Sequence, residues 1–170
     1  RINELLDTDA QIRNRPGARP APRFAGRIEF KDVSFDYGDE QPVPVLKNIN
    51  LTIEPGQTAA IVGPTGTGKT TLIALIARLY DPTTGSVLVD GQDVRDYTLK
   101  SLRDQVSFVL QDTTLLRAPV WQNIAYGRPD ASREDIARAA KAANAHEFIE
   151  KMPDGYDTMV GERGGTLSGG

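Results

Sequence analysis

The stretch Gly63-Pro64-Thr65-Gly66-Thr67-Gly68-Lys69-Thr70 decides the fold of this chain. The apolar run 59–62 precedes it and the apolar run 72–77 follows it, which predicts a strand, a glycine loop and a buried helix. Glycines let the backbone curl so that successive N–H groups point inward, and the following helix adds the positive end of its dipole. This arrangement is typical of a loop that binds a phosphate chain.

Two side chains at the end of the loop extend this prediction. Lys69 can bring an ammonium group to the outer phosphates, and the Thr70 hydroxyl can ligate a Mg²⁺ ion that bridges them. The sequence therefore predicts a nucleoside-triphosphate site. The alternative is a glycine-rich turn that matches the pattern by chance, which average residue usage predicts in roughly one chain in 200 of this length.

Length and composition limit the possibilities further. A chain of 170 residues, 39% of them hydrophobic, is long enough for one core and too short for two substantial ones. The net charge of −3 indicates no nucleic-acid surface, and the absence of cysteine excludes disulfides and thiolate metal sites. The longest apolar stretch, 72–79, contains Arg78 and is too short to span a bilayer. Because the chain opens on Arg1 and stops inside a Gly-Gly pair, we expect a piece of a larger protein.

The first 53 residues divide into two parts. Residues 1–12 place apolar side chains at helical spacing, and the prolines between 16 and 22 forbid regular structure and indicate a linker, with a domain boundary near residue 25. From Arg27 onward, apolar residues alternate with polar ones. This pattern predicts antiparallel strands that lead into the phosphate loop, at 28–35, 45–46 and 49–53.

Three residues near predicted strand ends each have two possible roles. Tyr37 follows the first strand, where its ring can stack on a base or simply pack. Asp90 ends the apolar run 86–89 and can hold Mg²⁺, although the adjoining Gly91 and the short connection favour a hairpin turn. Gln111 follows a predicted buried strand at 105–110, where its amide can reach Mg²⁺ or the attacking water, or make a loop hydrogen bond.

The second half of the chain has a helical pattern. A short helix is predicted at 99–102, and three more follow at 120–126, 136–143 and 145–151 with no strand between them, which indicates a helical lobe. Residues 132–135 are expected to cap the second of these three.

Two features of the lobe have a structural and a functional interpretation. His146 is the single histidine, so a surface or packing role is favoured over catalysis and no histidine pair can form a metal site. Ser168, followed by Gly169 and Gly170, can start a helix that offers its N–H groups to a phosphate, or can belong to a glycine-rich tail.

These residues together resemble a known family. From about Arg27 to Gly170 the chain resembles the nucleotide-binding domain of ABC transporters, in the exporter branch where each such domain follows a transmembrane domain in one polypeptide. Five motifs occur in the family's order: the aromatic loop at Tyr37, the Walker A loop at 63–70, the Q-loop at Gln111, the acidic loop at 161–164 and the signature at 167–170.

The resemblance implies an α/β fold. It predicts a P-loop NTPase core at 26–118 with an N-terminal antiparallel β subdomain, an α-helical signature subdomain at 119–170, and a missing C-terminal part. Residues 1–25 resemble the end of a transmembrane-domain helix extension and a Pro-rich linker. The resemblance also places Asp90 in a hairpin.

The family's ligands are ATP and Mg²⁺. The resemblance implies that Tyr37 stacks on adenine, that Thr70 and Gln111 lie near Mg²⁺, and that Lys69 and Gln111 take part in catalysis. Ser168, Gly169 and Gly170 would cap the γ-phosphate held by a second nucleotide-binding domain. The triphosphate itself would be wrapped by Gly63, Pro64, Thr65, Gly66, Thr67, Gly68, Lys69, Thr70 and Thr71.

The expected function is that of the ATPase domain of a membrane exporter, located at the cytoplasmic face of the cell membrane. Trp121, Tyr126 and Glu162 would lie near the transmembrane domain, and no nucleic acid is expected as a partner. The family's pattern is not matched at Ala118-Pro119 and at Gln122, where a small hydroxylated residue and a glutamate are usual.

The Walker B aspartate, the catalytic glutamate, the D-loop and the switch histidine should all follow Gly170. We therefore expect this chain to bind ATP without hydrolysing it, and the phosphate-loop strand to lack its neighbours. Two alternatives remain open at this point: a soluble ABC-type ATPase that acts on DNA or ribosomes, and a module that only binds ATP.

Overall fold

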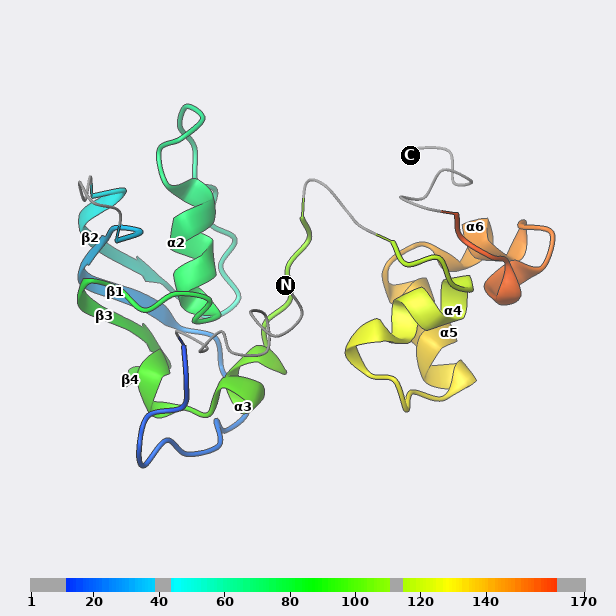
Figure 1. Ribbon diagram of the computed structural model, residues 1–170, viewed down its shortest axis with the longest axis horizontal. Helices are drawn as coiled ribbons and strands as arrows, with labels where there is room; N and C mark the ends of the chain where they lie inside the picture. The colour runs from blue at the N-terminus through cyan, green and yellow to red at the C-terminus, as the bar shows by residue number, and fades with distance from the viewer. Residues whose placement is uncertain (1–11, 39–43, 111–114, 162–170) are drawn as a thin grey trace, which may run out of the picture. The chain divides into compact units, whose positions relative to one another are not determined.

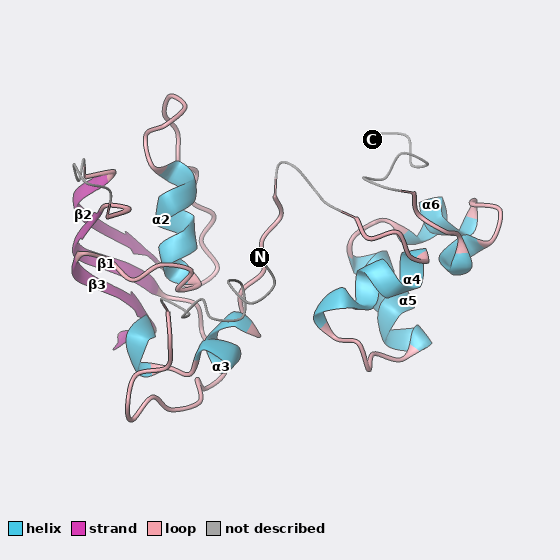
Figure 2. Cartoon of the chain, viewed as in Figure 1, coloured by secondary structure: helices cyan, strands magenta, loops and turns pink. Residues whose placement is uncertain are grey.

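The computed structural model describes residues 12–38, 44–110 and 115–161 (Figure 1). The chain forms two compact units, one up to Phe108 and one from Val109 onward. Strands and helices make up the first unit, and the second is helical (Figure 2). No helix within the three described ranges combines the length and the apolar character that crossing a bilayer requires. The division of the chain into domains at 25 and 118 remains a prediction.

A four-stranded antiparallel sheet forms the base of the first unit. Its order is β2-β1-β3-β4, which matches the predicted antiparallel subdomain. Phe30 in β1 pairs with Leu51 in β2 on one side and with Val87 in β3 on the other. The strands run over Ile28–Phe35 (β1), Leu46–Ile53 (β2), Thr84–Val89 (β3) and Gln92–Asp93 (β4).

Helix α2 (Lys69–Ile76) packs against this sheet (Figure 1). Leu72 and Leu75 enter a core that also contains Phe30 and Val87, and Leu75 is completely buried. Removing a side chain of this size from water contributes about 1.5–3 kcal/mol, so the sheet holds the helix that follows the glycine loop. The predicted buried helix is present, although its Ile73 remains 40% exposed.

The segment between β3 and the end of the unit is short and turn-rich. Asp90 and Gly91 join β3 to β4 with φ angles of 52° and 79°, which is the backbone of a two-residue hairpin. The hairpin interpretation of Asp90 is therefore correct. A 3₁₀ turn, η1 (Val94–Asp96), and helix α3 (Leu99–Arg103) follow.

Two predicted strands are not formed. Residues 59–62 have no regular secondary structure, and Val62 is 88% exposed. The strand predicted at 105–110 is also absent, because 104–105 form a turn and 106–110 have no regular structure. A strand needs a neighbour that pairs with its N–H and C=O groups, and the four paired strands of the described residues are all in the antiparallel sheet. Both predictions rested on the apolar composition of the segments, which does not supply a partner.

The helical unit has a small core of its own. Val120, Ala140, Ile149 and Val160 are buried together. At the start of its longest helix, Ser132 accepts a hydrogen bond from the backbone N–H of Asp135, whose carboxylate accepts one from Ser132 in return, as the predicted cap requires. The unit contains α4 (Val120–Ile124), η2 (Ala125–Gly127), α5 (Arg133–Ala142), α6 (His146–Glu150) and η3 (Gly155–Asp157).

Candidate functional site

The glycine loop turns sharply into helix α2. Gly66 and Gly68 have φ angles of 85° and 83°, which an L side chain rarely adopts, and Gly68 is the residue immediately before the helix. The first helical hydrogen bond runs from the backbone N–H of Leu72 to the carbonyl oxygen of Gly68, at 2.9 Å. The N–H groups of the first helical turn therefore face the loop and lack carbonyl partners within the helix.

Lys69 lies within the curl of the loop. Its Nζ atom donates to the carbonyl oxygens of Gly63, at 2.8 Å, and Pro64, at 2.6 Å. The Thr67 hydroxyl also donates to the Pro64 carbonyl, at 2.9 Å, so the loop is closed by its own side chains. The ammonium group is thus held beside the start of α2, where the helix dipole favours negative charge.

The aromatic residue Tyr37 is joined to the same helix. Its hydroxyl shares a hydrogen bond of 2.8 Å with the hydroxyl of Thr71, which is 5% exposed. Lys69 and Thr71 are separated by one residue of α2, so the structure brings Tyr37 and the end of the phosphate loop to one helix turn. Tyr37 and Thr71 are 34 positions apart in the sequence, and no local sequence pattern predicted their hydrogen bond.

The ring of Tyr37 is only partly packed. It meets Phe35 edge-on at 4.8 Å and Tyr80 edge-on at 5.3 Å, measured between ring centroids, and 52% of the residue is exposed. A hollow of about 280 Å³ lies beside it, bounded by Phe35, Tyr37, Gly38 and Tyr80 among others. The two sequence-based roles of Tyr37 are therefore compatible, because packing fixes the ring while half of its surface stays accessible for stacking.

Other predicted site residues lie elsewhere. Thr70 is exposed on the first turn of α2, beside Lys69. Trp121 and Tyr126 belong to the helical unit, where the guanidinium of Arg133 stacks on the Trp121 ring at 4.6 Å and Tyr126 is 72% exposed. Five predicted site residues fall outside the described residues: the Q-loop residue Gln111, the acidic-loop residue Glu162, and the signature residues Ser168, Gly169 and Gly170.

Asp90 has a role that the sequence did not suggest. Its carboxylate accepts hydrogen bonds from the backbone N–H groups of Ala25, Gly26 and Arg27, at 2.7, 3.0 and 2.8 Å. These three bonds involve both carboxylate oxygens, so the aspartate has a structural role at this turn. Partners more than 60 residues away leave no local signal in the sequence.

His146 takes part in packing, as the sequence favoured. Its Nδ1 atom lies 2.9 Å from the Tyr156 hydroxyl, and its Nε2 atom lies 3.4 Å from a carboxylate oxygen of Glu150. Burial raises the pKa of Tyr156, and the charge of Glu150 raises it further. All three residues belong to the helical unit, so this cluster stabilises that unit.

The phosphate loop, Lys69, Thr70 and Tyr37 form a site suited to a nucleotide. Backbone N–H groups and one ammonium can hold a polyphosphate, a hydroxyl can ligate a cation, and a half-exposed ring can stack on a base. These are binding functions. The described residues that line the hollow at the glycine loop, at positions 46, 49, 61–64, 67–69 and 72, include no carboxylate that could orient a water molecule for attack.

Known proteins resemble this chain along almost its whole length. Putative multidrug export ATP-binding/permease proteins of Staphylococcus aureus strains COL and MW2 are each 51% identical to it over 169 residues, which is 99% of this chain and 29% of each protein. The protein of the same description from the bovine strain RF122 is 49% identical over the same share. The chain thus spans less than a third of the length of these relatives.

A solved structure gives the same result. A bacterial Atm1-family ABC exporter with ATP bound matches 99% of this chain and 29% of its own length, with a TM-score of 0.86 and 40% sequence identity. The ABC transporter family itself matches residues 46–170, which include the glycine loop, α2 and the helical unit. The chain therefore belongs to the ABC transporter family.

Proposed function

We propose that this chain is the ATP-binding domain of a membrane exporter, and that it belongs to a longer protein with a transmembrane domain. The observation that carries the proposal is the position of Lys69, whose ammonium group lies inside a glycine loop at the start of α2. The names of the relatives, which describe export ATP-binding/permease proteins, support the same function. Nothing in those names supports the alternative of a soluble ATPase acting on DNA or ribosomes.

ATP binding would exchange one set of Lys69 contacts for another. Two neutral carbonyl oxygens now accept hydrogen bonds from its ammonium group, whereas a phosphate oxygen also carries a negative charge that attracts the ammonium. Because the ammonium is already beside the loop amides, this exchange needs little movement of the side chain. The loop amides and the start of α2 would hold the rest of the polyphosphate.

Thr70 is the described residue that fits a magnesium ion. Its hydroxyl is a hard oxygen ligand on the exposed first turn of α2, next to the residue that would contact the outer phosphates. Mg²⁺ would supply positive charge that neutralises the phosphate oxygens during transfer. We assign Gln111 to the same ion and to the attacking water, on the resemblance alone.

Two partners complete the proposal. A second nucleotide-binding domain would bring Ser168, Gly169 and Gly170 to the γ-phosphate, so that two domains enclose two ATP molecules. The transmembrane domain would meet the surface around Trp121, Tyr126 and Glu162.

Replacement of Lys69 tests the proposal in the longer protein, reconstituted in lipid vesicles. Lys69→Ala should abolish ATP-driven export and weaken Mg-ATP binding about 10- to 100-fold, because one charge-assisted bond contributes about 1.5–3 kcal/mol. Binding of adenosine, which has no phosphate, should change less than about threefold.

A second lysine provides the matched control. The side chain of Lys100 on α3 is 85% exposed and pairs with Asp104, the residue just after this helix, so Lys100→Ala should leave binding of both ligands and export unaffected. An equal loss of ATP and adenosine binding in Lys69→Ala would show that the loop is not where phosphates bind.

A further inference from the structure

Arg78 is a buried arginine that the proposed nucleotide site does not use. It lies two residues beyond the end of α2 and is 2% exposed. Its φ angle of 52° is uncommon for a residue other than glycine, and an arginine has no short polar side chain to stabilise it locally. A charged side chain in such a place is retained only where its partners satisfy it.

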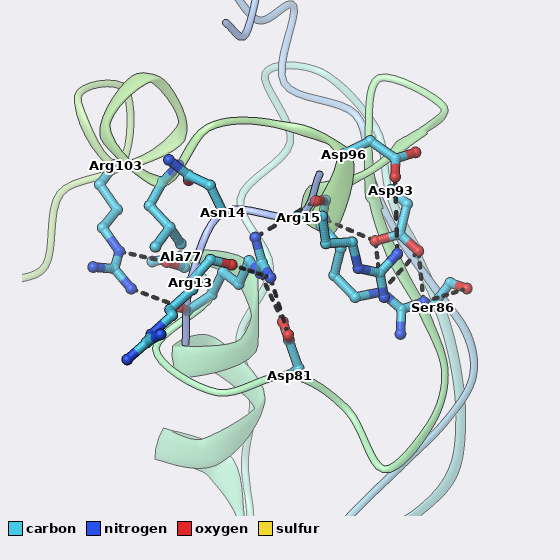
Figure 3. A network of polar contacts seen from close by, with 12 residues as sticks. Arg13, Asn14, Arg15, Ala77, Asp81, Ser86, Asp93, Asp96 and Arg103 are labelled. Carbon is cyan, nitrogen blue, oxygen red and sulfur yellow. Dashed lines mark hydrogen bonds and ion pairs between the residues drawn. The ribbon is translucent and has the colours of Figure 1, made fainter. Parts of the chain in front are cut away.

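Those partners come from three different segments. Nε and Nη2 donate to the two carboxylate oxygens of Asp81, at 2.8 and 3.1 Å. Nη2 also donates to the carbonyl oxygen of Arg13, at 3.0 Å, and Nη1 to that of Arg95, at 3.5 Å. Figure 3 shows Arg13 and Asp81 converging at the end of α2. Arg78 therefore connects the phosphate-loop helix to the chain that precedes the sheet.

The end of α2 is fixed by a second arginine. Arg103 of α3 donates from Nε to the carbonyl oxygen of Ala77, at 3.1 Å, and from Nη2 to that of Arg78, at 2.7 Å (Figure 3). These contacts satisfy carbonyl groups that a helix leaves unpaired at its C-terminal end, and place positive charge where the dipole favours it. The end of α2 is therefore held by the side chains of both Arg78 and Arg103.

The segment that Arg78 reaches is bound along its length. Asn14 accepts a hydrogen bond from the backbone N–H of Leu99, Arg19 donates its N–H to the carbonyl oxygen of Asp96, and Ala21 donates to the Ser101 hydroxyl. Farther along, the N–H of Phe24 donates to Gln105, and the three N–H groups at 25–27 donate to Asp90. Residues 13–27 therefore form a strap, by which we mean an irregular segment held on the nucleotide-binding unit by polar contacts.

We propose that Arg78 is a positioning residue that couples the phosphate loop to this strap. The inference rests on the proposed ATP-binding function. Helix α2 begins at Lys69 and ends at Ile76, about 10 Å away at 1.5 Å per residue, and Arg78 follows two residues later. A short helix moves as a rigid body, so a displacement caused by phosphate at the loop reaches the Arg13 carbonyl. The strap leads toward residue 1, on the side where the longer protein would place its transmembrane domain.

Hydrogen exchange in the longer protein tests the coupling. In the wild type, a non-hydrolysable ATP analogue with Mg²⁺ should slow exchange of the amides at 13–27 about fivefold or more, as expected for an allosteric coupling of ordinary size. Arg78→Lys keeps the charge and loses the forked donors, so the analogue should still bind with a dissociation constant within about threefold of wild type. Its effect on the strap should disappear.

Arg95 offers the matched control. Its side chain is also largely buried and contacts Asp93, Gly85 and Ser86, all within the β3–β4 region. Arg95→Lys should therefore retain the effect of the nucleotide on the strap. If Arg78→Lys does not fold, the pair Arg78→Gly with Asp81→Asn replaces it, because glycine accepts the positive φ and no charge is left unpaired.

The possible results separate the two proposals. A wild-type protein that binds the analogue without any change at 13–27 would overturn the coupling and leave the ATP-binding function intact. An Arg78 variant in which exchange at 13–27 is faster but responds to the analogue as in wild type would show a purely structural role, and would also overturn it. Failure of the wild type to bind the analogue would remove both proposals.

Discussion

Two glycines of the phosphate loop form a matched pair for testing how the loop is held. Gly66 and Gly68 have nearly equal φ angles, 85° and 83°. A Cβ atom built on Gly66 would meet nothing within 4 Å, whereas one on Gly68 would lie 2.8 Å from Cδ2 of Leu46 and 3.0 Å from Cγ1 of Val45. Gly66→Ala and Gly68→Ala therefore differ mainly in packing.

The expected magnitudes follow from this geometry. Alanine in a left-handed conformation costs about 1–2 kcal/mol at either position. At Gly68 an added cost of about 1–3 kcal/mol comes from overpacking, because the side chains of Leu46 and Val45 must shift. Val45 also bonds through its N–H to the carbonyl oxygen of Phe35, at 2.8 Å, which limits how far it can move. The difference corresponds to about 5- to 150-fold in an opening equilibrium.

Hydrogen exchange of the α2 amides in the nucleotide-free longer protein measures this difference. Gly68→Ala should raise the exchange rate of these amides at least about fivefold above that of Gly66→Ala. Gly91→Ala is a control, since its φ of 79° brings the same backbone cost in open space, far along the chain from α2. Equal rates in the Gly66 and Gly68 variants would refute the argument that the loop is held against Leu46.

Three further outcomes are expected. Tyr37→Phe should weaken ATP binding about 2- to 10-fold by losing one hydrogen bond, and Tyr37→Ala by more because stacking is also lost, as calorimetry would measure. Asp90→Gly should raise exchange of the amides at 25–27 about 10-fold or more, and Asp90→Asn less, because Asn keeps one acceptor oxygen. The hydrogen bond with Ser132 lowers the pKa of Asp135 from its ordinary 3.8, so the cap of α5 should be fully effective above that pH and lost as pH falls through the lowered value. The protection of the α5 amides from hydrogen exchange should follow this titration. Ser132→Ala should weaken the dependence of this protection on pH.

The parts of the fold that the sequence predicted correctly depend on local patterns. Three examples are the helix after the glycine loop, the antiparallel strands and the capping box at Ser132. The residues that predict each helix, strand or cap lie within about ten positions of one another. The same holds for the loop itself, because Gly66, Gly68 and Lys69 are neighbours in the chain. A site built from consecutive residues can be recognised before the rest of the fold is known.

The predicted strands at 59–62 and 105–110 show where such patterns stop being sufficient. Apolar residues such as Val62 and Val109 predict burial, but burial requires a partner surface, and both are exposed here. Hydrophobic content alone cannot distinguish a segment that pairs with a neighbouring strand from one that does not. The sequence also did not predict the pairing of β1 with β3, because this pairing joins residues 50 or more positions apart.

The contacts that join the strap to the nucleotide-binding unit belong to this second class. Arg78 is the one charged residue in the apolar run 72–79. A charge in such a run predicts that the side chain has a partner but does not identify that partner. Its partner at Arg13 is a backbone carbonyl, and a backbone carbonyl has the same chemistry at every residue. No side-chain pattern could therefore have revealed this bond. Phosphate binding requires specific residues at fixed spacing, whereas positioning of the loop helix requires only an acceptor at the right place, so the two functions leave very different traces in the sequence.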